Sequence, residues 1–246
     1  MKKRYFLLFL FLLAFFAGIL MMLYPVYRTR KDDKESSRKI ERFNEYVEAA
    51  TESPSEIQAL GRPDVLPGRP FSALRSACEA YNLEIFEQHQ RNLDDTAMKA
   101  PGISPSDYGY EQEIFCCLSI PAQNFEVPVY LGASSHNLDR GAAVLGQTSL
   151  PIGGKSTNCV IAGHRCWKAA IKFRVIESLD VGDSVFLKNP WETLEYRVVE
   201  AGVISPSAIE PIVIREGRDL LTLFTCTRGS RQRYLVTCER VPQEVN

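Results

Sequence analysis

The sequence predicts a mainly β protein in which about eight strands close into a barrel, preceded by helical segments and one transmembrane helix. From Glu113 onward, short apolar runs alternate with turn residues, which indicates strands. The earlier part of the chain instead has an unbroken apolar run and stretches with helical spacing. These patterns divide the chain into a membrane anchor (1–34), a helical extension (35–112) and the barrel (113–246).

The N-terminal apolar run predicts a membrane-spanning helix. Uncharged residues extend from Tyr5 to Tyr27 between basic flanks, and about 20 helical residues cross the hydrocarbon core of a bilayer. A cleaved signal peptide is the alternative, but its apolar part is shorter and ends in small residues. Bulky residues occupy positions 19–23 here. Because basic residues flank both ends, charge alone does not orient the helix.

Two helices are expected in the extension. The first has apolar residues at helical spacing within the charged stretch 35–51. The second begins at Ser72, the expected N-cap. Its apolar face is formed by Leu74, Cys78, Tyr81 and Ile85. The linker 61–70 is rich in glycine and proline, and residues 94–112 are expected to form a loop.

The barrel strands are expected where β-branched and aromatic residues cluster between turn residues. These runs are Ile114–Ile120, Val127–Leu131, Cys159–Ala162, Ser184–Lys188, Leu194–Ile204, Leu220–Cys226 and Tyr234–Val241. Helical patches are expected near Asn137–Ala143 and Lys168–Leu179. Closure into a barrel is favoured because it removes the edge strands that a small open sheet exposes.

The composition excludes several kinds of site. The chain has 29 basic and 30 acidic residues, which gives no electrostatic reason to expect a nucleic-acid partner. Its seven cysteines form no Cys-x-x-Cys pair, so neither a zinc site nor a complete disulfide framework is predicted. We therefore expect no metal, no cofactor and at least one free thiol.

Cys226 ends one predicted strand, and Arg233 begins the next after the loop 227–232. If the two strands form a hairpin, these residues face each other with Cβ atoms about 5 Å apart. The same register pairs Phe224 with Leu235 and Thr222 with Thr237. A cation at this distance favours the thiolate and can stabilise an oxyanion. The alternative is that Arg233 is a solvated charge, as we expect for Arg228 and Arg231.

Among the three histidines, His164 is the candidate acid and base. It follows the apolar run 159–162 at a glycine, and the end of a rigid strand is a common place for a functional side chain. His89 and His136 lie in polar, turn-like surroundings and are expected at the surface. The alternative is that His164 only ends its strand.

Three blocks of the sequence resemble the sortase family. Residues 222–226 (TLFTC) match the motif that contains the family's nucleophilic cysteine. Residues 162–165 (AGHR) resemble its histidine motif, and residues 232–236 (QRYLV) resemble its last strand, which contains an arginine. The resemblance covers residues 113–241, and its intervening blocks are most like the pilin-polymerising class C enzymes.

This resemblance implies a membrane-anchored cysteine transpeptidase whose catalytic domain is extracellular. Cys226 would attack an LPXTG-like sorting signal of a surface protein, His164 would protonate the leaving amine, and Arg233 would hold the oxyanion. The acceptor would be an amine such as a pilin lysine. The substrate contacts implied by the motifs are Thr225, Leu223 and Gly163.

The sequence departs from the class C pattern at the lid, where the Asp-Pro-aromatic motif is absent. Asp107-Tyr108 is the nearest candidate and Asp94-Asp95 a weaker one. Two other functions are also compatible with the sequence. One is a cell-wall-anchoring sortase that uses a peptidoglycan-precursor amine, and the other is a catalytically silent, membrane-tethered binding module.

Overall fold

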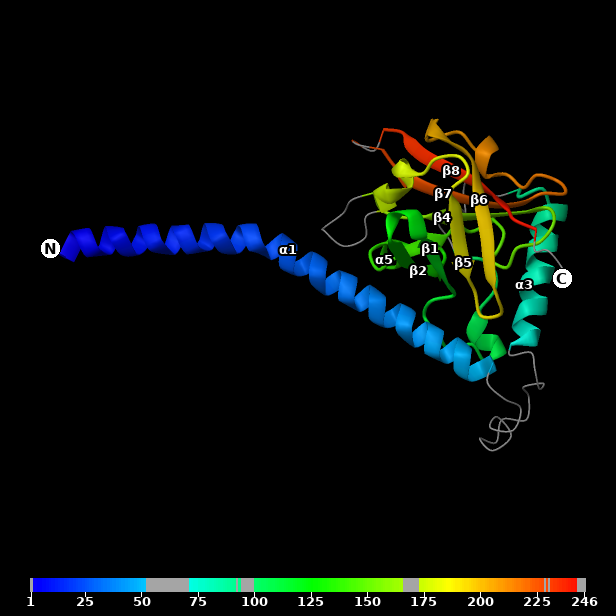
Figure 1. Cartoon of the computed structure of the whole chain (residues 1–246), viewed down its shortest axis with the longest axis horizontal. Coiled ribbons are helices and arrows are strands. Elements are labelled where there is room, and N and C mark those ends of the chain that lie inside the picture. The colour runs from blue at the N-terminus through cyan, green and yellow to red at the C-terminus, as the bar shows by residue number, and fades with distance from the viewer. Residues whose placement is uncertain are drawn as a thin grey trace.

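A closed barrel of eight strands forms the body of the protein, in the order β1-β2-β3-β4-β7-β8-β6-β5 (Figure 1). The computed structural model describes residues 2–51, 71–91, 93, 100–165, 173–227, 229 and 231–242. The strands are β1 (Cys116–Ile120), β2 (Phe125–Leu131), β3 (Ala142–Val144), β4 (Thr157–Ala162), β5 (Ser184–Lys188), β6 (Thr193–Ile204), β7 (Asp219–Cys226) and β8 (Arg233–Arg240). The helices are α1 (Lys2–Thr51), α3 (Ser72–Glu87), α5 (Ser135–Leu138), η1 (Pro105–Tyr108), η2 (Pro121–Gln123), η3 (Phe173–Ser178) and η4 (Glu210–Ile212).

The predicted barrel is confirmed, and each predicted run overlaps a strand. Two neighbouring pairs, β2 with β3 and β4 with β7, are parallel, and the others are antiparallel. The interior is filled by the inward-facing aliphatic side chains of the strands, including Leu118, Val129, Ile161, Leu223 and Val236. The barrel is therefore a packed core rather than a channel.

The predicted helical patch at Asn137–Ala143 is wrong for most of its length. The helix α5 ends at Leu138, and Ala142–Val144 forms β3, which joins β2 to β4. Gly141 allows the chain to pass close to β2, since a Cβ atom there would lie 2.4 Å from the carbonyl oxygen of Pro128. In the second patch, residues 173–178 form η3, and residues 168–172 lie outside the described residues.

The two ends of the barrel are distinguished by their turns. β4 and β7 both finish at the end that we call the Cys226 end, where β8 begins and β6 finishes opposite Arg233. The antiparallel pairing of β1 with β2 and β5 places the turn 121–124 at this same end. The turn 189–192 between β5 and β6 lies at the opposite end.

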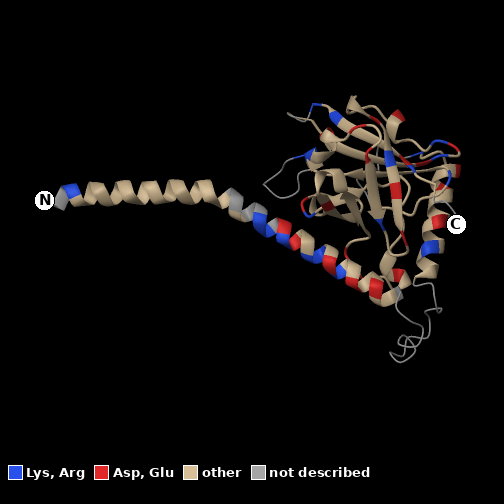
Figure 2. Ribbon diagram, in the orientation of Figure 1, with Lys and Arg blue, Asp and Glu red and all other residues tan. Residues whose placement is uncertain are grey.

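The helix α1 joins what the sequence predicts as two separate helices. It runs unbroken from Lys2 to Thr51, and Ile40, Phe43 and Val47 are buried against the barrel. Its segment Arg4–Tyr24 has a mean hydropathy of 2.9 and no burial in the protein, so it can cross a membrane by length and composition. Figure 2 shows that this segment, which projects away from the barrel, is almost free of charged residues.

The helix α3 covers the outside of the barrel with the face predicted for it. Leu74, Cys78 and Ile85 are buried, but Ser72 is not the N-cap, because Phe71 occupies that position with a positive φ of 58°. The side-chain amide of Asn82 bonds to both backbone groups of Leu150, which fastens α3 to the loop before β4. The predicted linker 61–70 lies outside the described residues.

Candidate active site

The hairpin of β7 and β8 has the predicted register. Cys226, the last residue of β7, pairs with Arg233, the first residue of β8. Phe224 pairs with Leu235, and Thr222 pairs with Thr237, as expected. The loop between the strands is closed by the backbone of Thr227, which donates a hydrogen bond to the carbonyl of Gln232 at 3.0 Å. Direct cross-strand partners present their side chains on the same face, so Cys226 and Arg233 share one face.

Cys226 is the accessible thiol among the described cysteines. It is partly exposed, whereas the others are buried: Cys78, Cys116, Cys117, Cys159 and Cys238. Burial raises the pKa of Cys78 to about 12 and raises the pKa values of the other four buried thiols further. Because the thiolate is the nucleophilic form of cysteine, the buried thiols are unsuited to attack a substrate. Cys166 lies outside the described residues.

The side chain of Arg233 lies on the same outer face of the hairpin as that of Cys226. Its guanidinium lies 5.9 Å from the ring centroid of Phe224, the neighbour of Cys226 on that face, and Nη1 donates to the carbonyl of Gln232 at 3.2 Å. These contacts hold a cation at the end of the strand where the thiol is located. Arg231 is exposed in the loop, and Arg228 lies outside the described residues.

His164 lies at the Cys226 end of the barrel because hydrogen bonds join β4 to β7 just before each strand ends. Ala162 pairs with Phe224 in the parallel ladder, and the backbone N–H of Gly163 donates to the carbonyl of Phe224 at 3.1 Å. The hydroxyl of Thr225 donates to the carbonyl of Gly163 at 2.8 Å. Continued by one residue on each strand, this register sets His164 level with Cys226, on strands that lie about 4.8 Å apart.

Residue 163, just before His164, is a glycine because an aromatic ring occupies the space where a side chain of residue 163 would lie. A Cβ atom at Gly163 would lie 2.5 Å from the ring of Phe173, the first residue of η3. The backbone N–H of Phe173 in turn donates to the carbonyl of His164 at 3.2 Å. Arg165 forms two hydrogen bonds with the carboxylate of Glu177, at 2.7 and 3.0 Å. The backbone on both sides of His164 is thus held in place.

Asp139, which no sequence pattern indicates, lies beside His164. The carboxylate oxygen Oδ1 is 3.6 Å from Nε2 of the imidazole, and the contact is an ion pair when the histidine is protonated. Asp139 follows α5, whose Asn137 side chain donates to the carbonyls of Leu131 and Gly132. The next residue, Arg140, instead contacts Glu113. A carboxylate in this position can hold the imidazole ring and stabilise its protonated form.

The three predicted substrate contacts are buried. Leu223 and Thr225 are 0% and 1% exposed, and Gly163 is also buried. Thr225 links β7 to β4, and Leu223 packs inside the barrel. These positions support the strands that present Cys226 and His164, and their contact with substrate stays a prediction.

The predicted lid residues lie on another part of the surface. Asp107 and Tyr108 belong to η1, which borders a hollow of about 350 Å³ that is also lined by Leu131. Leu131 is the last residue of β2, so η1 lies toward the opposite end of the barrel. The weaker candidate, Asp94-Asp95, lies outside the described residues. Within the described ranges, no group of three or more histidine, cysteine and acidic residues could hold a metal ion.

Comparison with known proteins places these residues in a known family. The model of the Sortase domain matches residues 118–241. Sortase A of Bacillus anthracis is 31% identical over 133 residues, which are 53% of this chain and 61% of that protein. The chain thus spans about three fifths of that curated relative, and it spans 45% of Sortase A from Streptococcus agalactiae.

Solved structures resemble a larger share of the chain. Sortase C1 of GBS Pilus Island 1 has a TM-score of 0.68 and 28% identity, covering 86% of this chain and 94% of its own. Sortase C-1 from Streptococcus pneumoniae has a TM-score of 0.55 and 31% identity, covering 67% of this chain and 92% of its own. The similarity therefore includes part of the region before the barrel as well as the barrel.

We predict that Gly163→Ala destabilises the domain, because the added methyl group must displace the ring of Phe173. Overpacking of this kind typically costs about 1–3 kcal/mol. The loss is measured as a lower free energy of unfolding in urea. Gly202→Ala is the matched control, since nothing lies within 4 Å of a Cβ atom at Gly202 in β6. Equal stability of the two variants would contradict the close contact between Gly163 and Phe173.

Proposed function

The chain belongs to the sortase family, whose members are cysteine transpeptidases, and we propose that it transfers an acyl group from a sorting signal to an amine. The observation that carries this proposal is the strand register, which sets Cys226 opposite Arg233 and level with His164. A thiol, an imidazole and a guanidinium at one end of a rigid barrel supply the groups that acyl transfer needs.

In the first half of the reaction, Cys226 acts as the nucleophile. Its thiolate attacks the carbonyl carbon of the scissile peptide bond, and the guanidinium of Arg233 stabilises the negative charge that develops on the carbonyl oxygen. The C–N bond then breaks, and protonated His164 gives its proton to the leaving amine. The products are a thioester on Cys226 and the released C-terminal part of the substrate.

In the second half, an acceptor amine attacks the thioester carbonyl. His164 takes a proton from the amine, the C–S bond breaks, and the thiolate of Cys226 is restored. The net result is one amide bond broken and one formed. Asp139, 3.6 Å from the imidazole, would hold the ring in place as the charge of His164 alternates between the two steps.

The substrate that we propose is a surface protein with an LPXTG-like sorting signal, and the proposed acceptor is a pilin lysine. The likeness to Sortase C1 of GBS Pilus Island 1, over 86% of this chain, supports the pilin acceptor. A peptidoglycan-precursor amine is the second candidate, because the curated relatives that match are both named Sortase A. A silent binding module is the remaining alternative, and it requires an unreactive Cys226.

We further propose that the segment Arg4–Tyr24 anchors the protein in the cell membrane with the barrel outside the cytoplasm. The length and apolar composition of this segment support the anchor. The orientation is supported by the proposed substrates, which are surface proteins that have crossed the membrane. Protease added to intact protoplasts would then digest the barrel.

The proposed activity is tested by incubating the protein with an LPXTG-type peptide and either a pilin fragment or a peptidoglycan-precursor amine. We expect mass spectrometry to detect a cleaved signal joined to the acceptor, and Cys226→Ala to form no product while it stays folded. Cys238→Ala is a control that should retain turnover, since Cys238 is buried. Substantial product from Cys226→Ala would rule out this mechanism.

We predict that Arg233→Ala lowers turnover more than it weakens substrate binding, because the oxyanion exists only in the transition state. Loss of one oxyanion donor typically costs about 100- to 1000-fold. Arg233→Lys should recover part of this loss, since it keeps the charge without the planar fork. Arg231→Ala is the control, as is Arg228→Ala, and both should turn over nearly normally. The measurement is steady-state kinetics on one peptide, and a normal rate for Arg233→Ala would contradict the assigned role.

A further inference from the structure

The connection between β6 and β7, residues 205–218, lies on the outer face of β4 and β7, and we call it the β6–β7 loop. The side-chain amide of Asn158 in β4 donates to the carbonyls of Pro211 and Val213 at 3.4 and 3.1 Å. Its oxygen accepts a hydrogen bond at 2.9 Å from the hydroxyl of Thr222 in β7. Asn158 and Thr222 are both 0% exposed, although strand alternation points them away from the barrel interior. The β6–β7 loop therefore covers them.

The loop reaches the surface beside the candidate site. It follows Ile204, the last residue of β6, which pairs with Arg233, and Arg233 pairs in turn with Cys226. On the outer face of β7, Phe224 and Cys226 are partly exposed, whereas Thr222 is buried. The exposed part of this face therefore ends where the β6–β7 loop begins to cover it.

A peptide joined to Cys226 and extended along β7 would meet this loop within a few residues. Cys226 and Thr222 are four residues apart in the sequence, and four strand residues span about 13 Å. An extended peptide covers about 3.3 Å per residue, so about four residues of an acyl donor cover the same distance. The position of the β6–β7 loop thus limits how an acyl donor can lie beside Cys226.

A glutamine of the helical extension holds this loop. Oε1 of Gln90 accepts a hydrogen bond from the backbone N–H of Ile214 at 2.7 Å, and Nε2 donates to the carbonyl of Gln147 at 2.9 Å. Because Gln90 is 7% exposed, water competes little for these hydrogen bonds. Figure 1 shows the loop, in orange, beside the C-terminal end of α3, which Gln90 closely follows.

The turn after α3 directs the side chain of Gln90 toward the barrel. His89 and Gln90 both have a positive φ, 52° and 49°, which residues with a side chain rarely adopt. The backbone N–H of Gln90 donates to the carbonyl of Ile85, and its carbonyl accepts from the N–H of Leu93, both at 3.0 Å. Leu93 is buried. An unfavourable backbone conformation persists where surrounding contacts determine it, so this turn has a defined shape.

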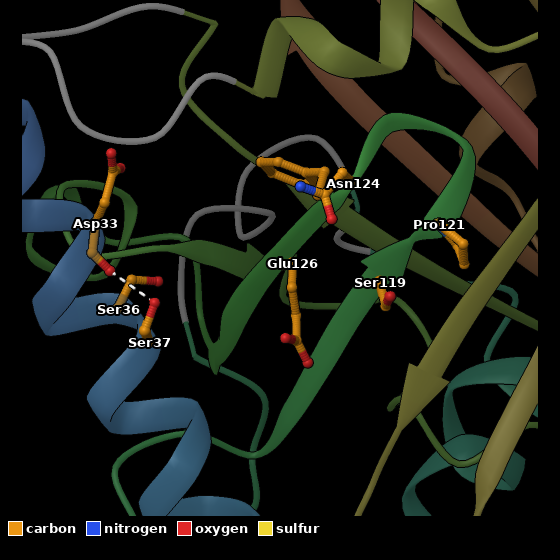
Figure 3. A pocket seen from close by; sticks show the side chains of 8 residues that line it. Asp33, Ser36, Ser37, Ser119, Pro121, Asn124 and Glu126 are labelled. Atoms are coloured by element: carbon orange, nitrogen blue, oxygen red, sulfur yellow. Dashed lines mark hydrogen bonds between the residues drawn. The ribbon is translucent and has the colours of Figure 1, made fainter.

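The helix α1 contacts the barrel on another side. Figure 3 shows Asp33, Ser36 and Ser37 of α1 facing the hairpin of β1 and β2 across a hollow of about 660 Å³. In the closed barrel, β1 and β2 lie across from β7 and β8. A substitution of Gln90 therefore acts at the β6–β7 loop and not at the surface on which α1 packs.

We propose that Gln90 is a positioning residue for the acyl donor: its hydrogen bond with Ile214 sets the position of the β6–β7 loop, and through the loop the affinity for the sorting signal. Gln90 lies outside residues 118–241, which match the Sortase domain. The helical extension thus takes part in substrate binding without touching the reacting atoms. This inference rests on the proposed function and adds a residue that acts on the binding of the acyl donor.

The hold on the loop is tested by hydrogen exchange of the full-length chain, followed by mass spectrometry. In Gln90→Ala we expect the amide of Ile214 to exchange about tenfold faster or more, because it loses its acceptor. The amides of β7 should exchange as before. Gln90→Met keeps nearly the volume of glutamine without its hydrogen bonds, so it separates loss of the bonds from loss of packing. Unchanged exchange at Ile214 in both variants would overturn the inference.

The consequence for binding is tested by steady-state kinetics with a sorting-signal peptide and an acceptor amine. If the loop occupies its binding position about a tenth of the time in Gln90→Ala, the apparent affinity falls by the same factor. We expect KM for the peptide to rise about tenfold, with kcat within about twofold and KM for the amine unchanged. A lower kcat with an unchanged KM for the peptide, or a change confined to the amine, would contradict the proposed role.

Asn82→Ala is the matched control. Asn82 is 5% exposed on α3, and its amide also bonds to two backbone groups, both of Leu150. Its loss should lower the free energy of unfolding in urea about as much as Gln90→Ala does. The exchange of Ile214 and KM for the peptide should stay unchanged. An equal rise in KM for both variants would indicate a general loss of stability and overturn the role of Gln90.

Failure of this inference and failure of the proposed function are distinguishable. The exchange measurement needs no turnover, so it decides whether Gln90 holds the loop even if the unaltered chain forms no product. Absence of product from that chain would overturn the transpeptidase proposal, and the binding role of Gln90 with it. A normal KM in Gln90→Ala would overturn the role of Gln90 alone.

Discussion

The candidate site depends on the hydrogen bonds that join β4 to β7 where both strands end. The hydrogen bonds from Gly163 to Phe224 and from Thr225 to Gly163 fix this parallel pair where both strands end. The first residue after each of these hydrogen-bonded positions carries a candidate functional side chain, His164 after β4 and Cys226 at the end of β7. Because β8 pairs with β7 in a fixed register, Arg233 joins the same end. A slip of one residue in β7 would turn the thiol into the barrel.

The same packing that builds the barrel separates one thiol from the others. Strand residues alternate between the two faces, so Cys159 and Cys238 point into the core, where burial raises their pKa values. Cys226 follows the buried Thr225 and points out of the barrel, on the same face as its cross-strand partner Arg233. Among the described cysteines, Cys226 is therefore the one that is not buried.

The sequence predicts those parts of the structure that depend on local pattern. The hairpin register follows from strand alternation and the short loop 227–232, so the pairing of Cys226 with Arg233 could be predicted and is confirmed. Asp139 could not, because its approach to His164 depends on the non-local pairing of β3 with β2 and β4. The sequence pattern at 137–143 predicts a helix where β3 begins, although the glycine at 141 signals the end of a helix. The sequence also does not indicate that α1 is continuous, because its composition changes sharply near residue 28.

In the proposed mechanism, Cys226 forms the covalent intermediate because the strand register places it at the same end of the barrel as His164 and Arg233. The most direct test is to quench the protein during reaction with a sorting-signal peptide in the absence of acceptor amine, and to map the modified residue by mass spectrometry. We expect a hydroxylamine-sensitive acyl group on Cys226 that accumulates far more slowly in Arg233→Ala. An acyl group on another cysteine, or product formation without any modification of Cys226, would contradict it.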